Sequence, residues 1–173
     1  MTVLLVSLGL SLALQASSIP STPDLGTEEG RCRAGESGPA FLVNVRGLKD
    51  RRGDLKLEVY PANDKDFLAD DNILIGQGKT FRRVVVPVPT DTSPKLCIRV
   101  PRPGRYSVSL LHDRNGNRKF DWMRDGIGFV GNPKLRRSAP AAMSASAVAG
   151  SRPTEISITV NYLRGLSMRP LRD

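Results

Sequence analysis

The stretch GRYSVSLLHDRNGNRKFD, residues 104–121, gives the strongest indication of the architecture. Its first half alternates as a half-buried β-strand does, with Tyr106, Val108 and Leu110 on one face. Its second half, residues 112–121, is polar and contains Asn-Gly, a strong hairpin signal. The stretch therefore predicts a strand that ends in a tightly coiled polar loop.

The polar loop carries side-chain oxygens at alternate positions. Calcium takes about six to eight oxygen ligands, which such spacing brings together in a coiled loop. Arg118 stands where an EF-hand loop has glycine, and Arg124 stands where it has a bidentate glutamate. The candidate ligands are Asp113, Asn115, Asn117, the Lys119 carbonyl, Asp121 and Asp125.

A plain turn explains the same residues. Asp and Asn side chains bond their own backbone in turns. The basic side chains of Arg114, Arg118, Lys119 and Arg124 would also oppose a dication. A hydrogen-bonded turn and a calcium-stabilised loop are both compatible with the sequence. His112, the one histidine, shares the strand face of the apolar residues, so we interpret it as a satisfied, half-buried core histidine rather than a ligand.

Other alternating segments predict about seven strands joined by short turns. The Val84–Val86 run predicts burial on both faces of its strand. Residues 142–148 fit a weak edge strand or a mobile loop, and residues 64–69 fit a short helical turn or an irregular loop. The pattern predicts an all-β fold, an antiparallel β-sandwich, with a partly open barrel as the alternative. The strands cover residues 41–46, 55–60, 81–88, 96–100, 105–112, 127–130 and 155–162.

The chain of 173 residues predicts one domain, residues 40–165, between less regular ends. Residues 1–18 hold an apolar run too short to span a bilayer, which predicts a signal peptide. Residues 19–39 are rich in Pro, Gly, Ser and charge and predict a flexible lead-in. Residues 166–173 predict a fraying tail. We therefore expect a periplasmic or secreted protein that does not span the membrane.

The two cysteines, Cys32 and Cys97, both follow the predicted signal peptide. In an oxidising compartment they would most simply form a disulfide, and two unpaired thiols are the alternative. Cys97 alternates with Leu96 and Ile98, so the bridge is expected outside the main core layer. No Cys-x-x-Cys spacing supports a metal site.

The chain is basic, with 26 Lys and Arg against 17 Asp and Glu and a formal net charge of +9. A basic surface attracts polyanions, and for an exported protein these are anionic envelope components such as lipid, lipopolysaccharide and polymers. Nucleic acid is not expected, because the compartment lacks it and no aromatic-and-basic stacking motif is present. The alternative is a solvated basic surface without a partner.

Catalytic motifs are missing from the sequence. It contains no Gly-x-Ser-x-Gly, His-Glu-x-x-His or phosphate-binding glycine loop. His112, Asp113 and Asp121 could serve a metal-assisted hydrolase, but neighbours in a strand point to opposite faces. The sequence therefore favours a non-catalytic exported module, with a polyanion binder and a hydrolase as the alternatives.

Four segments together resemble the bacterial domain of unknown function 2141. They are GRYSVSLLHDRNGNRKFD, DGIGFVGNP at 125–133, FLVNVRGL at 41–48 and ITVNY at 158–162. The resemblance covers about residues 41–162 and implies a small exported protein with a signal peptide and an immunoglobulin-like or transthyretin-like sandwich. It also implies a loop of the form H-D-x-N-x-N-x-x-x-D and brings no catalytic residue. Arg118 departs from the glycine that related loops often have.

Overall fold

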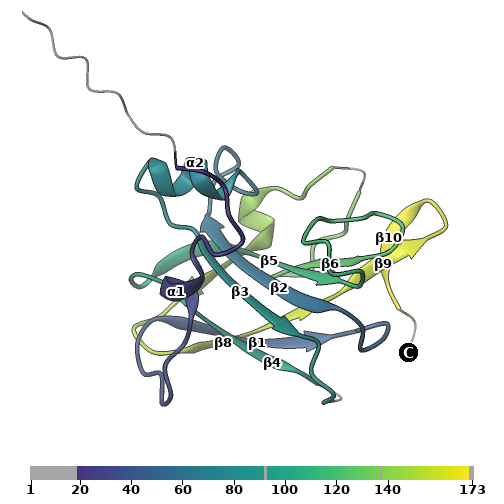
Figure 1. The fold of residues 1–173 in the computed structure, drawn as a ribbon, viewed down its shortest axis with the longest axis horizontal. Helices are drawn as coiled ribbons and strands as arrows, with labels where there is room; N and C mark the ends of the chain where they lie inside the picture. Colours follow the sequence, from purple (N-terminus) through teal and green to yellow (C-terminus); the bar gives the residue numbers. More distant parts are fainter. Residues whose placement is uncertain (1–18, 92, 137, 172–173) are drawn as a thin grey trace, which may run out of the picture.

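A computed structural model describes residues 19–91, 93–136 and 138–171 as two packed β-sheets with little helix (Figure 1). The predicted signal peptide, residues 1–18, lies outside the described residues. The smaller sheet has the strand order β4 (Lys95–Arg99), β1 (Ala40–Arg46), β8 (Thr154–Thr159). The expected all-β, sandwich-like architecture is confirmed at this level.

The larger sheet has seven strands. One edge of β5 pairs with β2, and the other pairs with β7 over its first half and β6 over its second. The order is β10 (Ser167–Pro170), β9 (Asn161–Arg164), β6 (Gly126–Phe129), β5 (Gly104–Asp113), β2 (Asp54–Pro61), β3 (Arg82–Pro87), with β7 (Ser146–Ala149) beside β5. The helices are α1 (Thr27–Gly30), α2 (Asp71–Gly76) and the 3₁₀ helix η1 (Ala142–Ala145).

The main core lies between the sheets and consists of the alternating apolar residues that the sequence assigned to inward faces. Burying such side chains stabilises the fold by about 1.5–3 kcal/mol each. Fully buried members include Phe41, Val43, Leu55, Leu57, Val59, Ile98, Val108, Leu110, Ile158 and Val160.

A smaller cluster covers the other face of the large sheet. There Tyr60 and Phe129 pack against Phe67, Leu74 and Phe81 from the loop and helix that follow β2. The two clusters together bury β5 on both faces from Tyr106 to Asp113. Alternation alone had indicated a half-buried strand.

Strand direction differs from the fully antiparallel prediction in one ladder. β8 lies parallel to β1, with Phe41 opposite Thr154 and Arg46 opposite Thr159. The described residues form ten strands instead of the predicted seven or so. Alternation shows which residues share a face but carries no information on the direction of the neighbouring strand.

The segment predicted as one last strand, residues 155–162, serves both sheets. β8 ends in the small sheet, and β9 begins in the large sheet after Val160, whose N–H donates to the Arg46 carbonyl at 2.9 Å. The chain then turns at Gly165, whose φ is 65°, and β10 pairs with β9. The predicted fraying tail is therefore partly a strand, because a glycine that tolerates positive φ permits the hairpin.

Strand β3 forms an edge of the large sheet, so the Val84–Val86 prediction was wrong. Val84 and Val86 are half-buried and Val85 is exposed. The smaller sheet's edge strand β4 faces this side of the molecule, and no ladder joins it to β3 within the described strands. An apolar run indicates burial on both faces only when strands flank it on both sides.

The lead-in, predicted to be flexible, packs across β3. The Arg83 N–H donates to the Gly26 carbonyl at 3.0 Å, and a Cβ on Gly30 would lie 2.7 Å from the Arg83 carbonyl oxygen. Ser21 Oγ also donates to Asp71 at 2.6 Å. Composition predicted no core for this segment, and it is held instead by polar contacts, backbone contacts and the Cys32–Cys97 disulfide.

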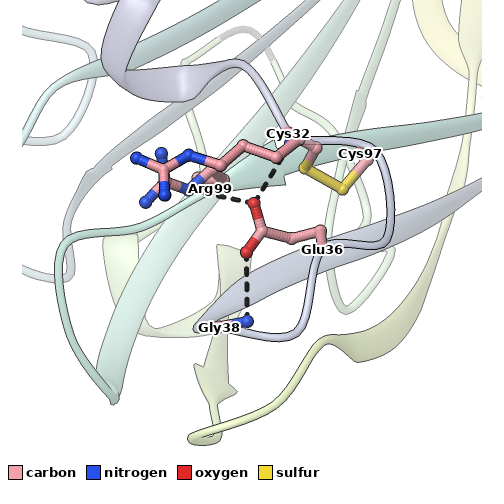
Figure 2. Close-up of a disulfide and its surroundings, with 6 residues drawn as sticks. Cys32, Glu36, Gly38, Cys97 and Arg99 are labelled. Carbon is pink, nitrogen blue, oxygen red and sulfur yellow. Dashed lines mark hydrogen bonds and ion pairs between the residues drawn. A yellow bond between two sulfur atoms is a disulfide. The ribbon is translucent and has the colours of Figure 1, made fainter.

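The predicted disulfide joins Cys32 to Cys97 with a Cα–Cα distance of 5.9 Å (Figure 2). It closes a loop between cysteines 65 residues apart. The lost entropy of the unfolded chain stabilises the fold by about 4 kcal/mol for a loop of this length. As expected, Cys97 lies outside the main core, between the buried Leu96 and Ile98.

Glu36 organises the turn beside the disulfide (Figure 2). Its carboxylate accepts the N–H groups of Gly38 at 3.0 Å and Arg33 at 3.2 Å, and it pairs with Arg99 at 3.0 Å. The Gly38 and Arg33 N–H groups lower the pKa of Glu36.

Among the described residues, no helix is long and apolar enough to cross a bilayer.

Candidate functional site

Two buried carboxylates hold the base of the polar loop between β5 and β6. Asp113 accepts the N–H groups of Gly116 at 2.9 Å and Arg118 at 2.6 Å. Asp125 accepts those of Arg114 at 3.0 Å and Asp121 at 2.7 Å. Buried carboxylates require such partners, because leaving them unpaired would be costly. The loop is therefore fastened to the sheet at both of its ends.

The remaining candidate ligands make local backbone bonds at the loop surface. Asn115 Oδ1 accepts the Asn117 N–H at 3.1 Å, and Asn117 Oδ1 accepts the Lys119 N–H at 2.9 Å. Asp121 Oδ1 accepts the Met123 N–H at 3.0 Å. Each of these three side chains thus bonds the backbone N–H two residues later, as in an Asx turn. Within the described part of the chain, no group of three or more His, Cys, Asp or Glu residues is placed to hold a metal ion.

Arg118 occupies the position where glycine would be expected, and it takes the glycine conformation. Its φ is 65°, close to the 69° of Gly116. The left-handed conformation lets its N–H point at Asp113. Its carbonyl accepts a bond from Lys56 Nζ at 3.3 Å, which ties the loop to β2. The sharp turn therefore forms despite the Cβ strain that this conformation imposes.

His112 is fully buried and both ring nitrogens have partners. Nε2 lies 2.9 Å from the Arg52 carbonyl, which can only accept, so Nε2 carries the proton. Nδ1 then accepts the Tyr162 O–H at 2.6 Å, and the Tyr162 oxygen accepts the Lys49 N–H at 3.0 Å. The network assigns one neutral tautomer. The predicted satisfied core histidine is confirmed, and it is more deeply buried than the expected half.

Burial governs the acid–base properties of this pair. It lowers the pKa of His112 and raises the pKa of Tyr162 to about 12. Both shifts favour the uncharged forms that the hydrogen bonds require. The pair therefore remains neutral at physiological pH.

An ion pair closes the solvent side of His112. Arg114 Nε lies 3.0 Å from Asp50 Oδ2, and a second guanidinium nitrogen bonds the same oxygen. The Arg114 contact lowers the pKa of Asp50. Arg114 also donates to the Arg124 carbonyl at 2.8 Å. The turn before β2 and the polar loop are thus joined over the histidine.

The residues considered for hydrolysis are not brought together. His112 bonds Arg52 and Tyr162, whereas Asp113 bonds backbone groups inside the loop. Asp121 lies at the loop surface near Arg124 at 3.5 Å. Sequence reasoning missed Tyr162 and Asp50 as partners of the site. The tyrosine could have been suspected, because it alternates with the apolar residues of the predicted strand 155–162 and a buried hydroxyl needs a partner.

A second polar cluster lies beneath the lead-in. The buried Glu58 accepts from Arg83 at 2.8 Å and from the Tyr60 hydroxyl at 2.8 Å, and Arg83 also pairs with Asp71 at 3.0 Å. Burial and the nearby Glu58 carboxylate raise the pKa of Tyr60 well above its usual value. Each charge in the cluster has an opposite partner, so the arrangement is suited to fixing the lead-in.

A groove of about 860 Å³ runs between the outer edges of β3 and β4. The lead-in and the polar loop contribute to its walls. Sequence reasoning missed the groove, because it depends on which strands form sheet edges. Its lining includes Val84, Val85, Val86, Leu96, Lys56, Lys95, Arg118 and Lys119.

One family model matches this chain, and its description is uncharacterized protein conserved in bacteria (DUF2141). The match covers residues 43–157, from β1 into β8, and includes the polar loop and Cys97. The comparisons with curated proteins and with solved structures gave no match. The family resemblance is thereby confirmed. The match contains GRYSVSLLHDRNGNRKFD and DGIGFVGNP in full and most of FLVNVRGL, and it ends before ITVNY at 158–162.

Proposed function

Since this chain belongs to the DUF2141 family of uncharacterized bacterial proteins, we propose that it is a non-catalytic module of the cell envelope. Its two sheets form an immunoglobulin-like or transthyretin-like scaffold, and the polar loop is a rigid corner of that scaffold. The state of His112 carries the proposal. A fully buried imidazole with both nitrogens hydrogen-bonded is unsuited to exchanging protons with a substrate.

The proposed compartment is the periplasm or the exterior. The Cys32–Cys97 bridge supports an oxidising environment, since such bonds are rare where thiols are kept reduced. Alkylating free thiols in protein taken directly from the periplasmic fraction tests this. We expect no labelling before reduction and two labelled cysteines after it. Two labelled cysteines in the untreated protein would contradict it.

The non-catalytic role is tested by screening hydrolase substrates with the wild type beside His112→Gln. Glutamine keeps a side-chain donor for the Arg52 carbonyl, so we expect the variant to fold. Circular dichroism verifies this. We expect no turnover that depends on residue 112. A wild-type activity that disappears in a folded variant would overturn the proposal.

Calcium binding by the loop is a second candidate. The left-handed Arg118 supplies the sharp turn that a calcium loop needs at that position, and oxygens alternate around it. Calorimetric melting in millimolar calcium, in magnesium and in chelator tests it. A hydrogen-bonded turn predicts the same Tm in all three. A calcium-specific rise that Asn117→Ala removes would establish the ion site instead.

Binding of anionic envelope components through the basic surface is a third candidate. It is supported by the formal net charge of +9. Electrostatic binding of this kind weakens steeply as salt rises. Retention on an anionic resin, measured from low to high salt, would reveal it.

A further inference from the structure

One end of the molecule gathers three turns, which we call the basic end. They are residues 47–53 before β2, residues 114–125 between β5 and β6, and residues 164–167 between β9 and β10. Asp54 pairs with Asp113, and Ile127 pairs with Asn161 in an antiparallel ladder, so these segments leave the sheet at the same end. Figure 1 shows them together on the right-hand side.

The basic end exposes large apolar side chains at the tips of two turns. Met123 is 80% exposed and Leu166 is 83% exposed, more than any other large apolar residue among those described. Phe120 is also exposed, and the half-buried Trp122 lies beside Met123 in the sequence. Exposed apolar side chains that gather at one end of a protein, surrounded by polar residues, are typical of sites that contact a protein or a membrane.

Exposed charge around these tips is mainly positive. The acidic residues are largely neutralised, since Asp113 and Asp125 are buried among backbone N–H groups and Asp50 pairs with Arg114. Asp121 lies near Arg124. The exposed cations of the basic end include Lys49, Arg52, Arg118, Lys119 and Arg124.

The opposite end differs in charge although it also exposes apolar groups. Met143 of η1 is 58% exposed, and Ile73 of α2 is exposed as well. Residues 61–79, which form part of that end, carry four aspartates against two lysines. Val148 is also exposed there and pairs with the exposed Arg105, so the opposite end is mixed in charge. The basic end differs because it carries the two most exposed large apolar side chains among the described residues.

We propose that the basic end docks onto an anionic lipid surface. Met123 and Leu166 enter the headgroup region, and the surrounding arginines and lysines lie against lipid phosphates. Apolar insertion with attraction to anionic lipid is the combination that anchors proteins at an interface. The inference rests on the proposed envelope role and names the surface that this module contacts.

A lipid surface fits these features better than a soluble polyanion. A polyanion would engage the cations but would gain nothing from the apolar tips. The expected effects follow from this difference. Each removed cation lowers binding roughly fivefold, and replacing both apolar tips lowers it at least tenfold.

Vesicle co-sedimentation of the chain beginning at Ile19 tests the proposal. Vesicles of phosphatidylcholine alone are compared with vesicles that also contain phosphatidylglycerol. Trp122 is the chain's one tryptophan, so its fluorescence reports directly on the basic end. We expect binding only to anionic vesicles, with a blue shift of Trp122. Met123→Ser with Leu166→Ser should lower binding at least tenfold, as should Arg124→Gln with Lys119→Gln. Met143→Ser with Ile73→Ser, at the opposite end, is the matched control and should change nothing.

Three results would overturn the proposal. They are absence of binding by the folded protein, binding that ignores the Met123 and Leu166 changes, and equal loss in the Met143 and Ile73 control. Strong binding to dextran sulfate without vesicle binding would also overturn it and favour a soluble polyanion. None of these outcomes bears on the non-catalytic role, which the His112 activity screen tests separately.

Discussion

Tyr162 shows how one hydroxyl completes the interior of the site. It donates to His112 Nδ1 at 2.6 Å and accepts the Lys49 N–H at 3.0 Å. Removing it leaves the buried His112 Nδ1 and the part-buried Lys49 N–H without their partner. The cost of each such group is typically 1–3 kcal/mol, which is larger than the net value of an average hydrogen bond.

We therefore expect Tyr162→Phe to lower the free energy of unfolding by about 2–4 kcal/mol. Urea unfolding at pH 7 measures it. Tyr106→Phe is the control, because its hydroxyl makes one bond, to the Arg102 carbonyl at 2.9 Å. The control should lose only about 1 kcal/mol. Equal losses of unfolding free energy in the two variants would show that the bond to His112 stabilises the protein no more than an ordinary tyrosine hydrogen bond.

Arg118 leads to the opposite expectation, a gain in stability. Its φ of 65° strains any residue with a Cβ. Arg118→Gly should raise the free energy of unfolding by about 0.5–1 kcal/mol, the strain relieved less the extra entropy of glycine. Arg118→Ala keeps the Cβ and separates this effect from loss of the charge. A gain in the alanine variant as large as in the glycine variant would contradict the backbone explanation.

At the level of elements, strand β6 depends on its glycines. A Cβ on Gly126 would lie 2.4 Å from Tyr162 Cε1 and 2.5 Å from Val160 Cγ1. A Cβ on Gly128 would lie 2.5 Å from Ile158 Cγ2. These close approaches let the segment from β8 into β9 pack directly on β6 and close one side of the sandwich.

Gly126→Ala should accordingly destabilise the protein by about 1–3 kcal/mol, because the added methyl overpacks a closed core. Chemical denaturation gives the value. Gly150→Ala is the matched control, since its nearest neighbour, Thr154 Oγ1, would lie at an ordinary 3.6 Å. A Gly126 variant as stable as this control would mean that β6 can move away from Tyr162 without cost.

The elements also show what the sequence could and could not predict. Alternation located the main strands and inward faces correctly, because each strand's own residues carry that period. It joined residues 155–162 into one strand, since the change of sheet at Val160 leaves the period intact. It also missed the parallel pairing of β8 and the edge position of β3, because strand order depends on distant segments.

The site was predicted to a similar extent. Spacing identified the loop, and strand parity placed His112 in the core. The partner Tyr162 lies 50 residues away and Asp50 lies 64 residues from Arg114, and no local pattern relates them. The two uses of an Asp or Asn oxygen, binding an ion or capping an N–H, have the same spacing, so only the geometry reveals the caps.

At the scale of the whole molecule, His112 links stability to pH. Its folded pKa is lowered by burial, whereas the unfolded chain titrates near the usual 6.5. Between these values the unfolded state binds more protons, so stability is fully present above about pH 6.5 and declines as the pH falls toward the folded pKa. The slope is at most about 1.4 kcal/mol per pH unit.

Urea midpoints measured from pH 7.5 to 3 check this decline. The lowered pKa of Asp50 adds a further loss only below its usual 3.8, so the two contributions lie in separate windows. His112→Gln should remove the upper window and leave the lower one. A wild-type profile as flat as that of the variant above pH 4.5 would be inconsistent with a buried neutral histidine.

The polar corner uses its reactive groups internally, with His112 held neutral by Arg52 and Tyr162. Nitrogen-15 NMR of the one histidine tests this directly, because its resonances need no separation from others. We expect a neutral ring with the proton on Nε2, a pKa below 6.5, and spectra unchanged by calcium. A proton on Nδ1, or a pKa at or above 6.5, would contradict the claim.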